Sequence, residues 1–549
     1  MRVMMKVSMV TALSLSTALA PSLAIAGDGT DAAQFHELLR SAVPSKLASD
    51  KAMKFVHLLP DQDVIDASNA ASIEQALESI KKSSLPKLTE HTEKMQKDLQ
   101  KQVGALEADK ILESRPITMV IVPGIFGEFI PTRGFEDVLS QPSQDRTTFK
   151  GLVGAAHAAN DPNAIDLSFD LYKQKEIVKP LSDLIHVGNI SNKAGKPIAR
   201  VVLLFTPEMS LESMGGLEDH AAMFNRRLSK YMAITGSQDL ALIGYSRGTV
   251  LGLEMLAQAK TQNLPWLSNV KGMISLGGVS WGSTLADDTE DESSANKKAI
   301  ESVRKLRKSL DPGSFIQTGK AWLAFADEMR KQLPAMQNHK LTPKDAQYKI
   351  SLSTQIDITS MLGLVGSVAG KLGLQRPATD FGNNVLRFQT FLDSVLAGVG
   401  TLTSSARTEW WKTHTLPTSV RYYSITGAMA NPEAGEIDNK AYTTAIGYNN
   451  NFDDKSLLQN RLDYEAISGI TLNDSQVSVA QVMILPNAAA ALNPANTGIQ
   501  ESFLGTVGTH HWGLALRIVN SMKDGQVNPF PREALLKALA AKVALDQGK

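Results

Sequence analysis

Short apolar runs recur along the chain and are typical of strands that are buried on both faces of a sheet. They are near-continuous rather than alternating, as expected for parallel strands, and they cover residues 117–122, 200–205, 239–244, 270–276 and 419–425. Segments with a helical pattern, at 217–235 and 247–260, lie between some of these runs. The alternation of strand and helix predicts an α/β fold, with a mostly parallel sheet covered by helices on both faces.

A second kind of pattern, with apolar positions at helical spacing, precedes the first strand. Residues 27–110 are predicted to be helical because apolar residues fall on one face of each segment, with Glu and Lys between them; these residues are Ile73, Leu77 and Ile80, and then Leu99, Val103 and Leu106. Pro86 is expected to separate two helices. We expect this N-terminal region to form an amphipathic hairpin that packs on the main domain.

The strand pattern is interrupted at 291–414, a mostly helical segment with a basic start. It contains two apolar, glycine-containing stretches, 361–369 and 391–399, which are too short to span a bilayer. We interpret this insertion as a helical cap or lid over the carboxyl edge of the sheet. The α/β core is then divided between residues 111–290 and 415–549.

The first 26 residues have the pattern of a cleaved signal peptide. Arg2 and Lys6 are followed by the apolar run 7–23, and Ala24-Ile25-Ala26 offers a cleavage site with small residues. A membrane anchor is the alternative, against which the short apolar run and its proline argue. We therefore expect an exported protein, periplasmic or secreted. The chain has no cysteine, so neither lipid attachment through cysteine nor a disulfide is available to it.

Composition narrows the possible partners. The chain has 56 basic and 56 acidic residues, a formal net charge of zero and no dominant basic stripe, which disfavours nucleic-acid binding. No H-E-x-x-H or comparable ligand spacing occurs, so no metal or other cofactor is predicted.

The sequence Gly244-Tyr245-Ser246-Arg247-Gly248 has the G-x-S-x-G pattern. It directly follows a predicted strand and directly precedes a predicted helix, which is the strand–turn–helix context of a nucleophilic serine. The turn is sharp enough to strain the serine backbone, and the flanking glycines avoid side-chain clashes. Ser246 is therefore the candidate nucleophile.

A serine hydroxyl needs a base to act as a nucleophile. In proteins that carry the nucleophilic serine on this strand–turn–helix motif, an acid and then a histidine follow the serine along the chain. Four histidines follow Ser246, of which His339 and His414 precede the end of the last predicted strand and are too early. His510 and His511 are adjacent after another short strand, and we favour His511.

The acid is expected between the last strands, where it can orient the imidazole. Asp474, in the turn-forming context Asn-Asp-Ser, is the preferred candidate. The competing carboxylates are Asp438, Asp453, Asp454, Asp463 and Glu465.

Ester hydrolysis through a serine also needs two donors for the oxyanion. The backbone N–H of Arg247, directly after the nucleophile, is one candidate. The second is expected from the loop that follows the first strand, 123–127, where we assign the N–H of Ile125, with Phe126 as the alternative.

Together these motifs resemble the α/β-hydrolase superfamily and, within it, bacterial lipases and esterases. Residues 122–127 are similar to the V-H-G-x-x-G oxyanion loop of that branch, and 243–248 to its nucleophile elbow. Residues 422–427 and 473–477 resemble its last strand and N-D-G-x-V acid loop, and His511 its final histidine. Pro123 and Ser475 depart from the family's usual His and Gly. The resemblance covers roughly 111–290 and 415–530.

This resemblance implies a serine hydrolase that cleaves carboxylic esters with hydrophobic acyl groups, either small-molecule or lipid esters. The apolar stretches of the cap are compatible with transient contact with a membrane or lipid interface, or simply with the core of the cap. A phospholipase or acyltransferase with the same triad remains an alternative, as does a catalytically inactive exported binding protein. Many lipases of this branch bind calcium near the acid loop, but Asp463 and Asp474 do not by themselves form such a site.

Overall fold

The structure is a computed structural model of the chain. It describes residues 29–43, 56–122, 124, 186–192, 194–203, 216–290, 295–337, 381–431, 461–462, 464–514 and 530–547.

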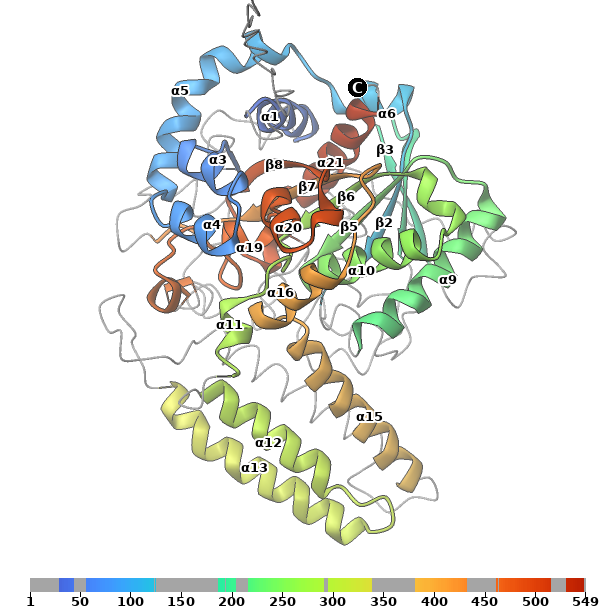
Figure 1. Ribbon diagram of the computed structural model, residues 1–549, viewed down its shortest axis with the longest axis vertical. Helices are drawn as coiled ribbons and strands as arrows, with labels where there is room; N and C mark the ends of the chain where they lie inside the picture. The colour runs from blue at the N-terminus through green and yellow to red at the C-terminus, as the bar shows by residue number, and fades with distance from the viewer. Residues whose placement is uncertain are drawn as a thin grey trace, which may run out of the picture.

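An eight-stranded sheet forms the centre of the molecule, with the strand order β1-β8-β7-β6-β5-β2-β4-β3 (Figure 1). The strands from β4 to β8 along this order run parallel, and β1 and β3 pair antiparallel at the two edges. Their bounds are β1 (His57–Leu58), β2 (Thr118–Val122), β3 (His186–Ser191), β4 (Pro197–Leu203), β5 (Leu240–Tyr245), β6 (Val270–Leu276), β7 (Arg421–Gly427) and β8 (Gln500–Val507). The predicted apolar runs are β2, β4, β5, β6 and β7, so the strand prediction is confirmed.

Helices cover both faces of this sheet. On β6, the adjacent residues Gly272 and Met273 point to opposite faces, as neighbours in a strand must. A Cβ at Gly272 would contact Val543 of α21 (Arg532–Asp546), whereas Met273 lies against Gly252 of α10 (Arg247–Thr261). Helix α9 (Leu217–Thr235) packs beside α10, and α1 (Thr30–Ala42) and α6 (Ala108–Ser114) pack beside α21. The predicted α/β-hydrolase fold is confirmed by this sheet order and by the serine at the end of the central strand β5.

The N-terminal region is helical as predicted, and it packs on the main domain, although it has more elements than the two helices of a hairpin. It contains α1, α3 (Gln62–Ser68), α4 (Ile73–Ile80), α5 (Leu85–Val103) and α6, and its short strand β1 pairs with β8. Pro86 lies in the first turn of α5, whose N-terminus is capped by the Ser84 side chain, so the expected break between two helices is confirmed. The strand β1 was not expected, because its two residues are too few to give a periodic signal.

A network of charged side chains ties α1 and α21 to the sheet. The buried Lys542 ammonium lies 2.7 Å from Asp31 Oδ1 and 2.5 Å from Asp546 Oδ2. Arg421 of β7 pairs with Asp31 Oδ2 at 2.6 Å, and Ser502 of β8 donates to the same oxygen. Burial by itself would raise the pKa of Asp31, but the Lys542 and Arg421 charges lower it to about 2. Both ends of the described chain are therefore fixed to adjacent strands.

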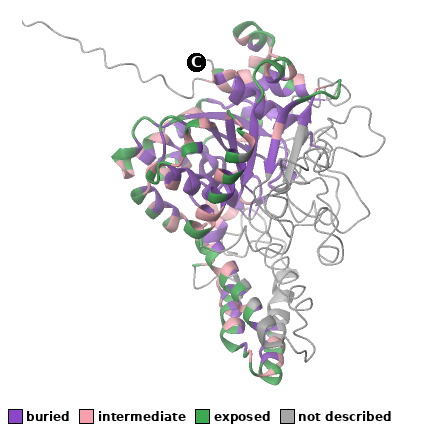
Figure 2. Cartoon of the chain, turned by 90° about the vertical axis from the view of Figure 1, so that its right-hand side faces the viewer, coloured by how far each residue is buried: buried purple, intermediate pink, exposed green. Residues whose placement is uncertain are grey.

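Three helices project from the body as an arm: α12 (Ala295–Ser309), α13 (Phe315–Gln337) and α15 (Phe381–Gly400) (Figure 1). The chain leaves the body through α11 (Thr284–Asp287) and returns through α16 (Ser404–Thr413). The helices α12, α13, α15 and α16 lie within the predicted cap, residues 291–414, whereas α11 precedes it. The apolar stretch 361–369 of the cap is outside the described residues. Figure 2 shows that the sheet is buried, whereas the arm carries many exposed residues.

The large apolar side chains that are exposed in the described part of the chain all belong to the arm: Phe315, Ile316, Leu323 and Leu386. No described helix combines the length and apolar character needed to cross a membrane.

Candidate active site

Ser246 occupies a strained turn between β5 and α10. Its φ of 54° and ψ of −127° lie outside the regions that L-residues favour. Gly244 allows this turn, because a Cβ there would lie 2.3 Å from the Thr249 Cα. The Thr249 hydroxyl donates to the Gly244 carbonyl at 2.7 Å and holds the first turn of α10 against the strand. The hydroxyl of Ser246 is thereby placed at the N-terminus of a helix, where negative charge is stabilised.

A buried imidazole–carboxylate pair is formed by the two other predicted residues. Nδ1 of His511 lies 2.7 Å from Oδ2 of Asp474, and both side chains are almost inaccessible. Oδ1 of Asp474 accepts the backbone N–H groups of Gln476 and Val477, at 3.0 and 2.9 Å. The carboxylate can therefore hold the proton of His511 on Nδ1 and leave Nε2 as the basic nitrogen.

His511 and Ser246 are brought to the same end of the sheet by shared neighbours. The Tyr245 hydroxyl, next to the serine, donates to the His511 carbonyl at 3.1 Å, and the two rings are 5.3 Å apart. A Cβ on Gly277 would lie 3.5 Å from both Asp474 Oδ2 and His511 Nδ1, so this glycine makes room for the pair. His511 Nε2 is buried without a hydrogen-bond partner within the described residues. It is available to take a proton.

The adjacent histidine has a different environment. His510 Nδ1 accepts the backbone N–H of Gly513 at 2.9 Å. Burial, with a further contribution from His511, lowers the pKa of His510 to about 3, so the ring is neutral. In the described structure the Asp474 carboxylate contacts His511 and not His510, which favours His511 as the base.

The competing carboxylates either lie outside the described residues or have another partner. Asp438, Asp453, Asp454 and Asp463 lie outside the described residues. Glu465 forms an ion pair with Arg461 at 2.5 Å and is occupied there. Asp474 is the acid that the described structure brings to His511.

The acid loop departs from the family pattern at one residue, and the structure shows how the loop accommodates it. Ser475 stands where related loops have glycine, and its φ is 86°. It therefore adopts the left-handed conformation that glycine adopts freely and serine only at a cost. The Ser475 backbone N–H is held by the Asn473 side chain at 3.0 Å, which keeps Asp474 in place despite the substitution.

Of the predicted oxyanion donors, one lies in the described part of the chain. Arg247 is the first residue of α10, where N–H groups lack partners within the helix. Ile125 and Phe126 lie outside the described residues. Gly124, just before them, is so close that a Cβ there would lie 3.0 Å from the Ser246 Cβ. The end of β2 therefore lies against the serine.

Sequence reasoning missed two supporting residues, Tyr245 and Thr426. Tyr245 is the variable second residue of the G-x-S-x-G pattern, so the motif says nothing about its hydroxyl. Thr426 donates to Asp474 Oδ2 at 3.4 Å, and its place near the end of a predicted strand was a usable signal.

Other features of the described residues do not coincide with this site. They contain no group of three or more His, Asp or Glu side chains arranged to hold a metal ion. A cavity of about 460 Å³ lies among α1, α5 and the loop after α5, and includes none of the predicted site residues.

Comparisons with known proteins gave distant structural similarities. No family model and no curated protein matches the chain. Among solved structures, a metagenomic carboxyl esterase, MGS0156, is 14% identical with a TM-score of 0.36, over 79% of this chain and 77% of that one. The mature form of the Bacillus licheniformis lipase BlEst2 is 12% identical with a TM-score of 0.28, over 74% of this chain and 87% of that one.

Proposed function

We propose that the protein is a serine hydrolase of carboxylic esters that works through an acyl-enzyme on Ser246. The observation that carries the proposal is the buried His511–Asp474 pair at the end of the sheet where the strained Ser246 turn lies. Strain at a turn and a buried imidazole nitrogen with no hydrogen-bond partner among the described residues are costs that a purely structural role does not require.

The proposed reaction has two steps. In the first, Ser246 Oγ attacks the ester carbonyl carbon while His511 Nε2 takes the hydroxyl proton, and the leaving alcohol then receives this proton as the C–O bond breaks. In the second, water attacks the acyl-enzyme, again with His511 as base, and the carboxylic acid is released. Asp474 stabilises the imidazolium in both steps. The N–H groups of Arg247 and Ile125 stabilise the oxyanion.

A hydrophobic acyl group is the substrate class that the arm supports. Ile316, Leu323 and Leu386 are 69%, 65% and 50% exposed, and such side chains are suited to contact with a lipid interface. The same triad would serve a phospholipase or an acyltransferase, which differ in leaving group and acceptor. Export through residues 1–26 also stays a prediction, since these residues are outside the described structure.

Hydrolysis of p-nitrophenyl esters, from acetyl to palmitoyl, tests the proposal. Ser246→Ala is expected to abolish turnover and labelling by a fluorophosphonate, whereas Ser268→Ala, at an exposed serine, leaves both unchanged. His511→Gln is expected to reduce kcat by about three to four orders of magnitude, as when a triad member is removed, and His510→Gln much less. Turnover that survives Ser246→Ala would contradict the mechanism. Absence of both turnover and labelling in the native protein would favour a binding role.

A further inference from the structure

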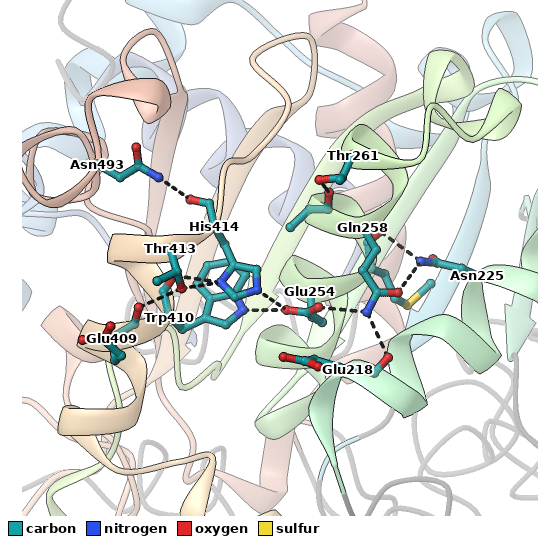
Figure 3. Close-up of polar contacts among 12 residues, drawn as sticks. Glu218, Asn225, Glu254, Gln258, Thr261, Glu409, Trp410, Thr413, His414 and Asn493 are labelled. Carbon is teal, nitrogen blue, oxygen red and sulfur yellow. Dashed lines mark hydrogen bonds and ion pairs between the residues drawn. The ribbon is translucent and has the colours of Figure 1, made fainter.

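The arm is anchored to α10, the helix that follows the nucleophile. Trp410 of α16 donates its indole N–H to the buried Glu254 carboxylate of α10 at 2.6 Å. Asn493, which follows α20 (Pro486–Leu492), donates to the His414 carbonyl at the end of α16, at 3.0 Å (Figure 3). The returning end of the arm is therefore held within the body.

The two ends of the arm are also tied to each other. Asp287 of α11 accepts the backbone N–H and the hydroxyl of Ser404, the first residue of α16, both at 2.6 Å. Thr401, between α15 and α16, accepts from Arg247 Nε at 3.1 Å. With its base fixed in this way, the arm holds its far end away from the body (Figure 1).

The far end of the arm is built from parts of three helices. Helix α12 runs away from the body and α13 returns, so the turn at 310–314 lies at the far end (Figure 1). The first half of α15 lies beside this turn, because Gln389 Nε2 donates to the Leu310 carbonyl at 3.0 Å. We call this end of the arm, residues 304–323 and 386–393, the tip.

Exposed cations gather at the tip. Helix α12 contains six basic residues and one acidic residue. Arg307 is paired with Asp393 of α15 through two hydrogen bonds, at 2.8 and 2.7 Å. Arg304, Lys305 and Lys308 are exposed, and they form no hydrogen bond or ion pair with the described residues. These three charges are therefore available to attract an anionic partner.

Apolar side chains are exposed at the same tip. Ile316 and Leu323 share the exposed side of α13 with Lys320, since positions i, i+4 and i+7 lie on one face of a helix. Leu386 of α15 is half exposed. Elsewhere in the described part of the chain no large apolar side chain is exposed. Apolar surface that faces water is thus confined to the place where the cations lie.

Apolar side chains beside cations match the surface of a bilayer that contains anionic lipids. The headgroup phosphates attract the cations, and the acyl region beneath them accepts the apolar side chains. A nucleic acid would satisfy the cations but not the apolar side chains. A second copy of the chain, docked tip to tip, would bring like charges together, which is unfavourable. The combination therefore favours a negatively charged lipid surface.

We propose that the tip of the arm docks the protein on a lipid bilayer that carries anionic headgroups. Arg304, Lys305 and Lys308 lie at the phosphates, and Ile316 and Leu386 enter the acyl region. This docking goes beyond the proposed hydrolysis and does not depend on it. Because the base of the arm is fixed beside the nucleophile helix, docking brings the candidate active site to the lipid surface.

Cosedimentation with lipid vesicles tests the proposal, in the Ser246→Ala background so that no lipid is hydrolysed. Vesicles with equal parts of phosphatidylcholine and phosphatidylglycerol are expected to bind the protein more tightly than vesicles of phosphatidylcholine alone. Lys305→Gln with Lys308→Gln should weaken binding to the mixed vesicles by about 30-fold, since each basic residue near an anionic surface contributes about fivefold. Ile316→Ser with Leu386→Ser should weaken it by about tenfold.

The matched control removes two charges from the body. Lys82→Gln with Lys196→Gln is suitable because both lysines are exposed and form no ion pair with the described residues. This control should bind the mixed vesicles nearly as well as the parent protein. A loss equal to that of the tip variant would show that only net charge matters and would overturn the proposal. Equal binding to the two kinds of vesicle would overturn it as well.

Two further outcomes would assign the tip to another partner and so refute the docking. One is release of the protein from the mixed vesicles by duplex DNA. The other is a dimer, seen by sedimentation velocity without vesicles, that Ile316→Ser with Leu386→Ser converts to a monomer. Because binding is measured without turnover, failure of the native protein to hydrolyse esters would count against the proposed function alone and leave the docking intact.

Discussion

Acidification should destabilise this protein through three histidines that are buried in the neutral form. His36 Nδ1 lies 3.0 Å from His57 Nδ1, and His57 Nε2 donates to the Leu504 carbonyl at 2.7 Å. Burial lowers the pKa of His36 and of His510 to about 3, and that of His57 to about 4. In the unfolded chain each ring titrates near 6.5. Below that pH the unfolded state binds protons that the native state does not, so stability falls as pH falls from 6.5 toward 4.

The magnitude follows from the size of the shifts. A pH of 5 is about 1.5 units below the pKa of each ring in the unfolded chain. At 1.36 kcal/mol per pKa unit, the three rings together lower the free energy of unfolding by about 6 kcal/mol. Glu501 acts in the opposite direction, because burial raises its pKa to about 6. The native state therefore binds a proton below pH 6 that the unfolded state binds only below about 4.5, and by pH 5 this returns about 1 kcal/mol. The net loss of about 5 kcal/mol is comparable with the whole stability of many proteins.

Urea unfolding followed by tryptophan fluorescence at pH 7.5, 6.5, 5.5 and 5.0 measures this loss. His510→Asn isolates one term, because its amide oxygen can replace Nδ1 as acceptor for the Gly513 N–H without titrating. The difference between wild type and His510→Asn should change by about 2 kcal/mol between pH 7.5 and 5. A wild-type stability that stays constant over this range, or a pH-independent difference, would refute the argument.

Three further predictions concern other contacts. Gly427→Ala should reduce kcat by about two orders of magnitude with the circular dichroism spectrum retained, because its Cβ would lie 2.3 Å from the Thr509 carbonyl oxygen beside the two histidines; unchanged kcat would contradict the close fit. Asp31→Ala should cost about 3–5 kcal/mol of unfolding free energy by leaving Lys542 without one of its partners, and Asp31→Leu with Lys542→Met should recover part of it; equal losses in both would count against the ion-pair explanation. Ile316→Ser with Leu323→Ser should lower activity on emulsified long-chain esters but not on p-nitrophenyl acetate; an equal effect on both substrates would exclude a role at the interface.

The parts of the fold that sequence predicted are those with strong local signals. The strands β2, β4, β5, β6 and β7 are continuous apolar runs, and the turn at Ser246 is marked by glycines that its geometry requires. The strands β1 and β3 were not predicted, since one has two residues and the other, His186–Ser191, mixes polar and apolar positions. Their pairing is decided by the neighbouring strands rather than by local preference.

The candidate site likewise combines a feature with a local signal and contacts that have none. Ser246 can be identified from a local motif, but the choice between His510 and His511 depends on a contact with Asp474, 37 positions away from His511. The contact between Arg247 and Thr401 spans 154 positions and has no local signature. Hydrophobic periodicity locates helices, but it does not show which helix donates a hydrogen bond to a buried Glu254.

The ion pair of Asp31 with Lys542 joins residues that are 511 positions apart. One partner is in the first described helix and the other in the last, and between them they pack on β7 and β8. A chain that has been synthesised only as far as β8 has α1 but lacks α21 and Lys542, so this part of the core cannot yet close. A product truncated before α21 would therefore leave this face of the sheet uncovered and accessible to proteases.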